Sequence, residues 1–218
     1  MNLSKVRFLL LGLSVISLGV VFGTLLWLKL APTVVYRNGS ERPLEGLAQY
    51  GLVPEFSLTE RSGRTISIAD LRGKIWIADF IYTTCTDTCP LQAAEMAKLQ
   101  EQWINERDLK LVSFSVDPER DTPQVLSDYA KRFKADANSW LFLTGGKEQI
   151  AGLVQDGFRL AAMPAPSAGS DSGVILHSPR FVLVDRETTI RGYYDSRDAE
   201  ALHRLKRDVA SLLQNKKE

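Results

Sequence analysis

Hydrophobic positions along this chain form one long uninterrupted run near its start, followed by short runs separated by polar segments. Residues 8–28 carry no charged side chain. As a helix rising ~1.5 Å per residue, they would span roughly 30 Å, the thickness of the hydrocarbon core of a bilayer. The run is also longer than the ~7–15 apolar residues of a secretory signal. The pattern predicts a short tail and a transmembrane signal anchor within residues 1–30, with a cleaved signal peptide as the alternative.

After a tether at residues 31–50, short apolar runs predict β-strands. The first two alternate apolar and polar residues around Ser62-Gly63, which is the pattern of a β-hairpin. The next two are continuous β-branched or apolar runs, typical of strands buried on both faces of a sheet. The predicted strands are residues 56–59, 65–68, 75–82, 109–116, 140–144, 180–185 and 188–194.

Between the later strands, apolar residues recur at the three- and four-residue spacing of helices. Thr122 is a suitable N-cap and Pro123 a suitable first residue for one of them. Residues 69–74 are predicted to form a turn, and residues 161–173, rich in Ala, Pro, Gly and Ser, a loop. The predicted helices are residues 91–107, 122–133, 147–158 and 199–213.

Strands that alternate with helices of this length predict an α/β domain with a largely parallel sheet. The element order, with a cysteine-containing turn between the first buried strand and the first long helix, is that of a thioredoxin-like fold. Residues 51–218, about 170 residues, are enough for one domain with its own core. We therefore expect an α/β, thioredoxin-like domain with an N-terminal β-hairpin, preceded by a single N-terminal transmembrane helix.

Charge and composition exclude some classes of function. The chain has 27 Lys and Arg against 26 Asp and Glu, a formal net charge of +1. No basic stripe interleaved with aromatic residues is present, so we exclude a nucleic-acid partner. Two cysteines are too few for a disulfide-stabilised scaffold. The charges that flank the apolar run do not decide its orientation in a membrane.

The two cysteines, Cys85 and Cys89, are four residues apart in the predicted turn between strand and helix. The N-terminal end of a helix carries partial positive charge, which favours thiolate over thiol. Residues four apart in a first helical turn face the same side, so both sulfurs can reach one ion. Thiolates are soft donors that select Cu(I) or Zn. A reactive or metal-binding dithiol is therefore predicted, with a structural disulfide or two inert buried thiols as the alternative.

Two further residues are candidate metal ligands. His177 lies just before the last hairpin, which in a thioredoxin-like fold is beside the cysteines, so its imidazole is a candidate third ligand. Asp117 follows the second buried strand, and the carboxyl ends of strands line the site in this architecture. It is expected near the metal or near the ligands, with an ordinary Asp-Pro turn as the alternative. The other histidine, His203, is expected to be exposed on the closing helix.

Asp79 is a carboxyl group inside an apolar strand, six residues before Cys85. Burial would raise its pKa, so that it could accept a thiol proton during disulfide chemistry. Thioredoxins have the same six-residue offset, and their Val-Asp-Phe strand resembles this Ala-Asp-Phe stretch. The alternative is that Asp79 lies at an edge of the sheet that is partly exposed to water. Pro179 is a candidate for the cis-proline that thioredoxin-like folds place opposite their cysteines, although a trans bond is equally compatible with the sequence.

Four stretches, taken in order, resemble the Sco/SenC family and together cover about residues 50–215. They are residues 65–74, 79–90 and 115–122, and His177-Ser178 followed by 181–185. Thr86 departs from the proline of many members, and Asp79 is not universal among them.

The resemblance implies a membrane-anchored, thioredoxin-like domain on the periplasmic side of a bacterial inner membrane, with the tail in the cytoplasm. In a eukaryote the domain would face the mitochondrial intermembrane space. It implies copper, as Cu(I) or Cu(II), bound by Cys85, Cys89 and His177. The implied role is to deliver copper to the dinuclear copper site of cytochrome c oxidase or to maintain the thiols of that site. The implied partners are the copper-site subunit of the oxidase and other copper chaperones or thiol reductants.

Two enzyme classes are alternatives to a copper-binding assembly factor. In a membrane-anchored thiol–disulfide oxidoreductase, Cys85 would attack a disulfide, Cys89 would resolve it and Asp79 would handle the proton. The three residues between the cysteines argue mildly against that class, because two are usual there. A peroxidase of the peroxiredoxin type shares the element order but needs a single peroxidatic cysteine in a different setting.

Overall fold

The computed structural model describes residues 47–160 and 178–215, which all fall within one structural unit, Arg42–Glu218. The predicted anchor and most of the predicted tether lie outside the described residues. Within the described ranges, no helix has the length and apolar character needed to cross a bilayer. The described end of the tether hydrogen-bonds to the sheet, because Ala48 N and Tyr50 N donate to the carbonyls of Arg191 and Ile190 at 3.1 and 2.9 Å.

A seven-stranded sheet in the order β2-β1-β5-β4-β3-β6-β7 forms the centre of the fold. The three central strands β3, β4 and β5 are parallel, whereas the remaining pairs are antiparallel. The strands are β1 (Ser57–Glu60), β2 (Thr65–Ser67), β3 (Ile75–Ile81), β4 (Leu109–Ser115), β5 (Trp140–Thr144), β6 (Arg180–Val184) and β7 (Ile190–Asp195). This arrangement confirms the α/β class, the parallel centre and both predicted hairpins, β1–β2 and β6–β7.

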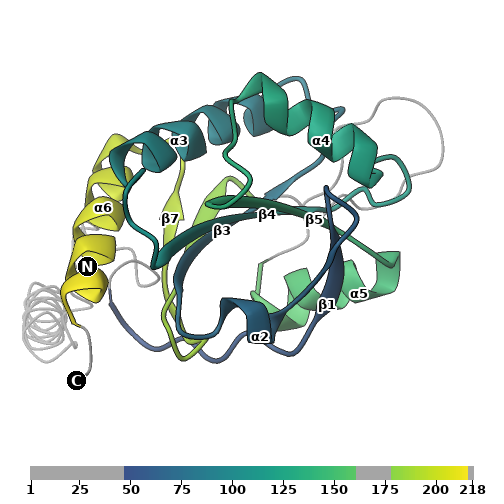
Figure 1. The fold of residues 1–218 in the computed structure, drawn as a ribbon. Helices are drawn as coiled ribbons and strands as arrows, with labels where there is room; N and C mark the ends of the chain where they lie inside the picture. Colours follow the sequence, from purple (N-terminus) through teal and green to yellow (C-terminus); the bar gives the residue numbers. More distant parts are fainter. Residues whose placement is uncertain (1–46, 161–177, 216–218) are drawn as a thin grey trace, which may run out of the picture. The chain divides into compact units, whose positions relative to one another are not determined.

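Helices cover both faces of the sheet. Side chains from α3, α4 and α6 pack in one hydrophobic cluster, and those from α2 and α5 pack in another on the opposite face. Figure 1 shows this three-layer arrangement, with α3 and α4 above the sheet and α2 and α5 below it. The helices are α2 (Ile68–Leu71), α3 (Thr88–Gln102), α4 (Pro123–Arg132), α5 (Lys147–Gly152) and α6 (Ala199–Gln214).

The central strand β3 is buried along its whole length, as its continuous apolar run predicts. Its face toward α2 and α5 contributes Trp76, Ala78 and Phe80 to the core. Its face toward α3, α4 and α6 contributes Ile75, Ile77 and Ile81. Side chains two residues apart point the same way along a strand, so Asp79 lies between Ile77 and Ile81 on this second face. The carboxyl group is therefore directed into the same layer as the helix that carries Cys89.

The structure corrects two local expectations and decides a third point that the sequence left open. Residues 68–71 form a short helix, α2, where the sequence pattern suggested a turn, and Asp70 caps it by accepting from the N–H and hydroxyl of Ser67 at 2.8 and 2.7 Å. The third long helix is interrupted, because α5 ends at Gly152 and a π-helical turn follows at Leu153–Gly157. Ser178–Pro179 is trans, since none of the described peptide bonds is cis.

The helix after the cysteines also differs in its limits. α3 begins at Thr88 with Asp87 as its N-cap residue and ends at Gln102, five residues before the predicted end. Cys89 therefore belongs to the first turn of α3, whereas Cys85 precedes the helix. By contrast, α4 is capped as predicted, with Thr122 Oγ1 accepting from Val125 N at 3.4 Å and Pro123 at the first helical position.

Candidate metal centre

Cys85 and Cys89 are both free thiols at the carboxyl end of β3, with exposed fractions of 8% and 1%. Two hydrogen bonds order this segment: Cys85 N donates to the carbonyl of Tyr82 at 3.1 Å, which closes the turn that ends at Cys85, and Cys89 N donates to Cys85 Sγ at 3.4 Å, which links the two cysteines. The thiol of Cys89 is also within hydrogen-bonding reach of the Cys85 sulfur. The two sulfurs therefore meet on one side of the turn, as the sequence predicts.

The two thiols differ in acidity. Burial opposes ionisation of Cys85, but the N–H groups of Cys89 and Asp87, the Cys89 thiol and the Tyr82 hydroxyl together lower its pKa. Burial raises the pKa of Cys89 far above its ordinary value, and the neighbouring Cys85 and Asp79 add to the effect. The two thiols are therefore unequal, and Cys85 loses its proton before Cys89.

Asp79 is completely buried beneath this pair, and neither of its carboxylate oxygens has a hydrogen-bond partner among the described residues. Ser113 lies opposite it on β4, but the Ser113 hydroxyl accepts from Trp140 Nε1 at 2.9 Å and only weakly favours the charged form of Asp79. Burial dominates and raises the pKa of Asp79 to about 7. The predicted burial of this carboxyl near the thiols is confirmed, and a wet strand edge is excluded.

Two tyrosines near the sulfurs were not recognised from the sequence. The Tyr82 hydroxyl hydrogen-bonds the Cys85 sulfur, and burial, followed by this contact, raises the pKa of Tyr82. Tyr129 comes from α4, and its buried hydroxyl has no hydrogen-bond partner in the described ranges. Burial raises the pKa of Tyr129, and the charges of Cys89, Asp79 and Cys85 add to the effect. Tyr82 belongs to the apolar pattern of a strand and Tyr129 to that of a helix face, so only the tertiary structure shows that both lie near the sulfurs.

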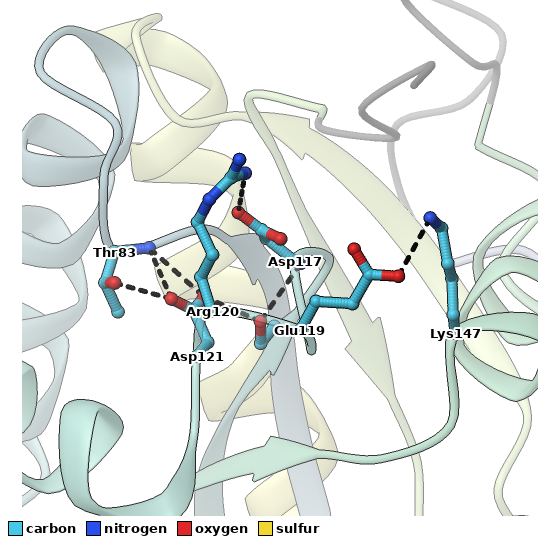
Figure 2. A network of polar contacts seen from close by, with 7 residues as sticks. Thr83, Asp117, Glu119, Arg120, Asp121 and Lys147 are labelled. Atoms are coloured by element: carbon cyan, nitrogen blue, oxygen red, sulfur yellow. Dashed lines mark hydrogen bonds and ion pairs between the residues drawn. The ribbon is translucent and has the colours of Figure 1, made fainter. Parts of the chain in front are cut away.

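Asp117 lies at the end of β4, as expected, but the structure gives its carboxylate another partner. Arg120 Nη1 donates to Asp117 Oδ2 at 3.0 Å, and Asp117 N donates to Ser115 Oγ at 3.1 Å (Figure 2). Among residues 47–160 and 178–215, no three His, Cys, Asp or Glu side chains are grouped to hold a metal. The described structure thus does not unite Asp117 with the cysteines, and its role at the metal stays a prediction.

The connection between β4 and α4, residues 116–122, also contains Asp121, which is not recognisable as a site residue from the sequence. Asp121 is fully buried and accepts hydrogen bonds from the Thr83 N–H, the Thr83 hydroxyl and the Ser115 hydroxyl. Figure 2 shows Asp121 directed toward Thr83, in the segment that leads to the cysteines. Burial raises the pKa of Asp121, although the hydrogen bonds from Thr83 and Ser115 favour its charged form.

His177, the predicted third ligand, lies outside the described residues. His203 is exposed on α6, as predicted. The described part of the site thus offers two adjacent sulfur donors. Soft sulfur donors of this kind fit Cu(I) and do not fit Mg or Ca.

Comparisons with known proteins agree with these motifs. The family model described as SCO1/SenC matches residues 45–214. The SCO1 protein homolog of Bacillus subtilis (strain 168) is 34% identical over 134 residues, which are 61% of this chain and 67% of that protein.

Two solved structures share the fold. One is BsSco, described as a member of the Sco family of cytochrome c oxidase assembly proteins with a disulfide switch; it has a TM-score of 0.65 and 28% identity, over 80% of this chain and 100% of that chain. The other is Bradyrhizobium japonicum ScoI with copper bound, which has a TM-score of 0.60 and 28% identity, over 72% of this chain and 99% of that chain. The match of the family model over most of the chain, together with the thioredoxin-like fold and the paired cysteines, shows that this protein belongs to the SCO1/SenC family.

Proposed function

We propose that this protein binds copper through Cys85, Cys89 and His177 and acts in the assembly of the dinuclear copper site of cytochrome c oxidase. The observation that carries the proposal is the pair of free sulfurs on one side of the turn, joined by the hydrogen bond from Cys89 N to Cys85 Sγ. Two soft sulfurs and a neutral imidazole suit Cu(I), and Cu(II) is accommodated when water or a carboxylate such as Asp117 adds a ligand. The copper-bound relative and the relative named for oxidase assembly support the same role.

Delivery of copper would proceed by ligand exchange. The copper-site subunit of the oxidase would present its own cysteines, and these would replace the sulfurs of Cys85 and Cys89. Copper binding by both sulfurs displaces the proton of Cys89, whose pKa is raised. Asp79 is buried below Cys89 and has a pKa of about 7, so its carboxylate would accept this proton. We also propose that residues 8–28 anchor the domain, so that it faces the periplasm or its mitochondrial counterpart, where other copper chaperones and thiol reductants would supply it.

A second function, thiol–disulfide exchange, is favoured by the difference in acidity between the cysteines. The Cys85 thiolate would attack a partner disulfide, form a mixed disulfide and release one partner thiolate. The Cys89 sulfur, after passing its proton to Asp79, would then displace the second partner thiolate and form a Cys85–Cys89 disulfide. The partner gains two electrons and this protein loses two. Such a reaction would maintain the cysteines of the oxidase site in reduced form, and both functions would use the same sulfurs.

Replacing His177 with alanine is expected to separate the two functions. Structural zinc sites bind their metal with about 10–16 kcal/mol over four ligands, roughly 3 kcal/mol per ligand; on that scale, loss of the imidazole from the three-ligand site should weaken Cu(I) binding about 100-fold. Anaerobic copper titration of the full chain, read by competition with a Cu(I) chelator, measures this for Cu(I). With Cu(II), the thiolate-to-copper charge-transfer band should be lost or shifted.

Disulfide exchange provides the matched control for His177→Ala. Because the imidazole takes no part in the exchange steps, reduction of a model disulfide by the dithiol should proceed at the rate of the unmodified protein. His203→Ala, which alters the exposed histidine of α6, should change neither measurement. Unchanged copper affinity in His177→Ala would remove that residue from the ligand set and would leave thiol–disulfide exchange as the better supported function.

A further inference from the structure

Asp121 connects two segments that meet at the carboxyl end of the sheet. Its carboxylate accepts from Thr83 N at 3.2 and 3.3 Å and also from the Thr83 hydroxyl. On the other side, Ser115 Oγ donates to Asp121 Oδ2 at 2.7 Å. Thr83 is two residues before Cys85, and Ser115 is the last residue of β4. One side chain therefore joins the segment that leads to the thiols to the neighbouring strand (Figure 2).

The surroundings of Asp121 extend this connection into the sheet. Val116 N donates to the carbonyl of Ile81 at 2.8 Å, which continues the β3–β4 pairing one step past the strands. The Ser115 hydroxyl that donates to Asp121 accepts from Asp117 N at 3.1 Å, and Asp121 N donates to the carbonyl of Asp117 at 2.9 Å. Hydrogen bonds from the Asp121 backbone and from Ser115 of β4 thereby fix the carboxylate, so it is a rigid acceptor for Thr83.

The donor set around Asp121 matches a carboxylate, which has two acceptor oxygens and no donor. Its hydrogen-bond partners, the Thr83 N–H, the Thr83 hydroxyl and the Ser115 hydroxyl, are all neutral donors, and together they use both oxygens. An asparagine at this position has one acceptor oxygen, so its amide N–H₂ would face at least one of these groups, and a hydroxyl there would have to rotate and accept instead of donating. The hydrogen bonds that fix Thr83 and Ser115 would thus be rearranged or weakened.

The other acidic side chains of the same connection are differently placed. Asp117 pairs with Arg120, whose side chain is 70% exposed, and Glu119 pairs with Lys147 at 3.2 Å in solvent. Because the cation of each pair lies in solvent, these ion pairs contribute little to the position of a chain segment. Asp121 is the fully buried member of the group, 0% exposed against 9% for Asp117, and it is the one that hydrogen-bonds the segment before the cysteines.

We propose that Asp121 is a positioning residue of the dithiol centre: by fixing Thr83 against the end of β4, it sets the position of Cys85 relative to Cys89. Cys85 N donates to the carbonyl of Tyr82, so Thr83, which Asp121 holds, lies inside the turn that ends at Cys85. A disulfide requires its two Cβ atoms about 3.5–4.5 Å apart, and two sulfurs can share one copper ion only when they converge on it. Both activities would then depend on Asp121, although it contacts neither sulfur. The inference deepens the proposed function, since copper affinity is one of its readouts.

Asp121→Asn in the full-length protein tests this inference. The equilibrium constant for oxidation of the Cys85–Cys89 pair by glutathione disulfide should fall about tenfold, equivalent to about 30 mV for a two-electron couple. Cu(I) affinity should fall by a similar factor, and the thiolate-to-copper charge-transfer band should shift. Glu119→Gln, in the same connection but bonded only to the exposed Lys147, should match the unmodified protein in both measurements.

A pair of changes at Thr83 separates positioning from a general loss of stability. Thr83→Val keeps the shape of the side chain and removes the hydroxyl donor to Asp121, so it should reproduce part of the shift in the glutathione equilibrium. Thr83→Ser keeps the donor and should restore the equilibrium. If Asp121→Asn fails to fold, the difference between Thr83→Val and Thr83→Ser in the glutathione equilibrium still tests the positioning role of Asp121.

The proposal is overturned if Asp121→Asn lowers the melting temperature but leaves the glutathione equilibrium and the charge-transfer spectrum unchanged, because Asp121 would then be merely structural. Equal effects of Thr83→Val and Thr83→Ser would overturn it as well. Failure of the proposed copper function would look different: the unmodified protein would not bind copper, whereas the glutathione equilibrium, which needs no metal, would still respond to Asp121.

Discussion

Replacing Asp79 with valine is expected to raise the free energy of unfolding at pH 8 by up to about 4 kcal/mol. The carboxyl is completely buried without a hydrogen-bond partner among the described residues, and burial raises its pKa from 3.8 to about 7. About three units at ~1.36 kcal/mol per unit give this ceiling. Valine is close in size, favours a strand and would join Ile77 and Ile81 in the same layer of the core.

The gain should depend on pH in a defined direction. Because the pKa of Asp79 is higher in the folded state, the unfolded chain loses this proton first, and ionisation of Asp79 lowers the stability of the native protein as pH rises from about 4 to about 7. The difference between Asp79→Val and the unmodified protein should thus be small at pH 4, grow through this range and stay constant above pH 7. Urea unfolding of the reduced proteins at pH 4, 6 and 8 measures it, and a difference independent of pH would contradict the assigned cause.

A functional cost should accompany this gain in stability. If Asp79 accepts the proton of Cys89, its removal should slow closure of the Cys85–Cys89 disulfide by about 100-fold, the lower end of the ~10²–10⁴-fold range of general base catalysis. Stability and exchange rate would then change in opposite directions in one variant. A buried ionisable group that destabilises the fold yet lies beside reactive sulfurs is the pattern expected of a functional residue.

Most of the fold could be predicted from the sequence because its signals are local. The run that forms β3 is apolar throughout, Trp140–Thr144 forms β5 with the predicted limits, and Thr122 with Pro123 marks the start of α4. The short helix α2 was missed although Ser67 and Asp70 have the spacing of a capping box, since only four helical residues follow the cap. The interruption after Gly152 has no such local signal, because a π-helical turn depends on packing.

The site was predictable where one element carries the chemistry. Cys85, Cys89 and Asp79 are recognised from β3 and the turn that follows it. Asp121 was not, because residues 117–121 contain three carboxylates and only the tertiary structure shows that Asp121 is the fully buried one that accepts from Thr83. Asp117 occupies the expected strand end, but the nearby Arg120 provides it with an ion pair that strand position alone does not reveal.

Cys85 is expected to react with iodoacetamide at least about tenfold faster than Cys89 in the reduced, metal-free protein at pH 7.5. Alkylation requires the thiolate and access to the sulfur, and both favour Cys85. The N–H groups of Cys89 and Asp87 lower the pKa of Cys85 against the effect of burial, whereas burial raises that of Cys89 and leaves it 1% exposed. Single-cysteine variants separate the two rates: Cys89→Ser leaves Cys85, and Cys85→Ser leaves Cys89.

Backbone geometry makes this comparison informative. The N–H of residue 89 that donates to Cys85 Sγ remains in Cys89→Ser, so the Cys85 thiolate should keep most of its stabilisation. Comparable alkylation rates in the two variants would show that the turn does not distinguish the sulfurs. A large ratio would identify Cys85 as the sulfur that first meets copper or a partner disulfide. Cys89 would then act second, because its proton must leave before its sulfur can bind or displace anything.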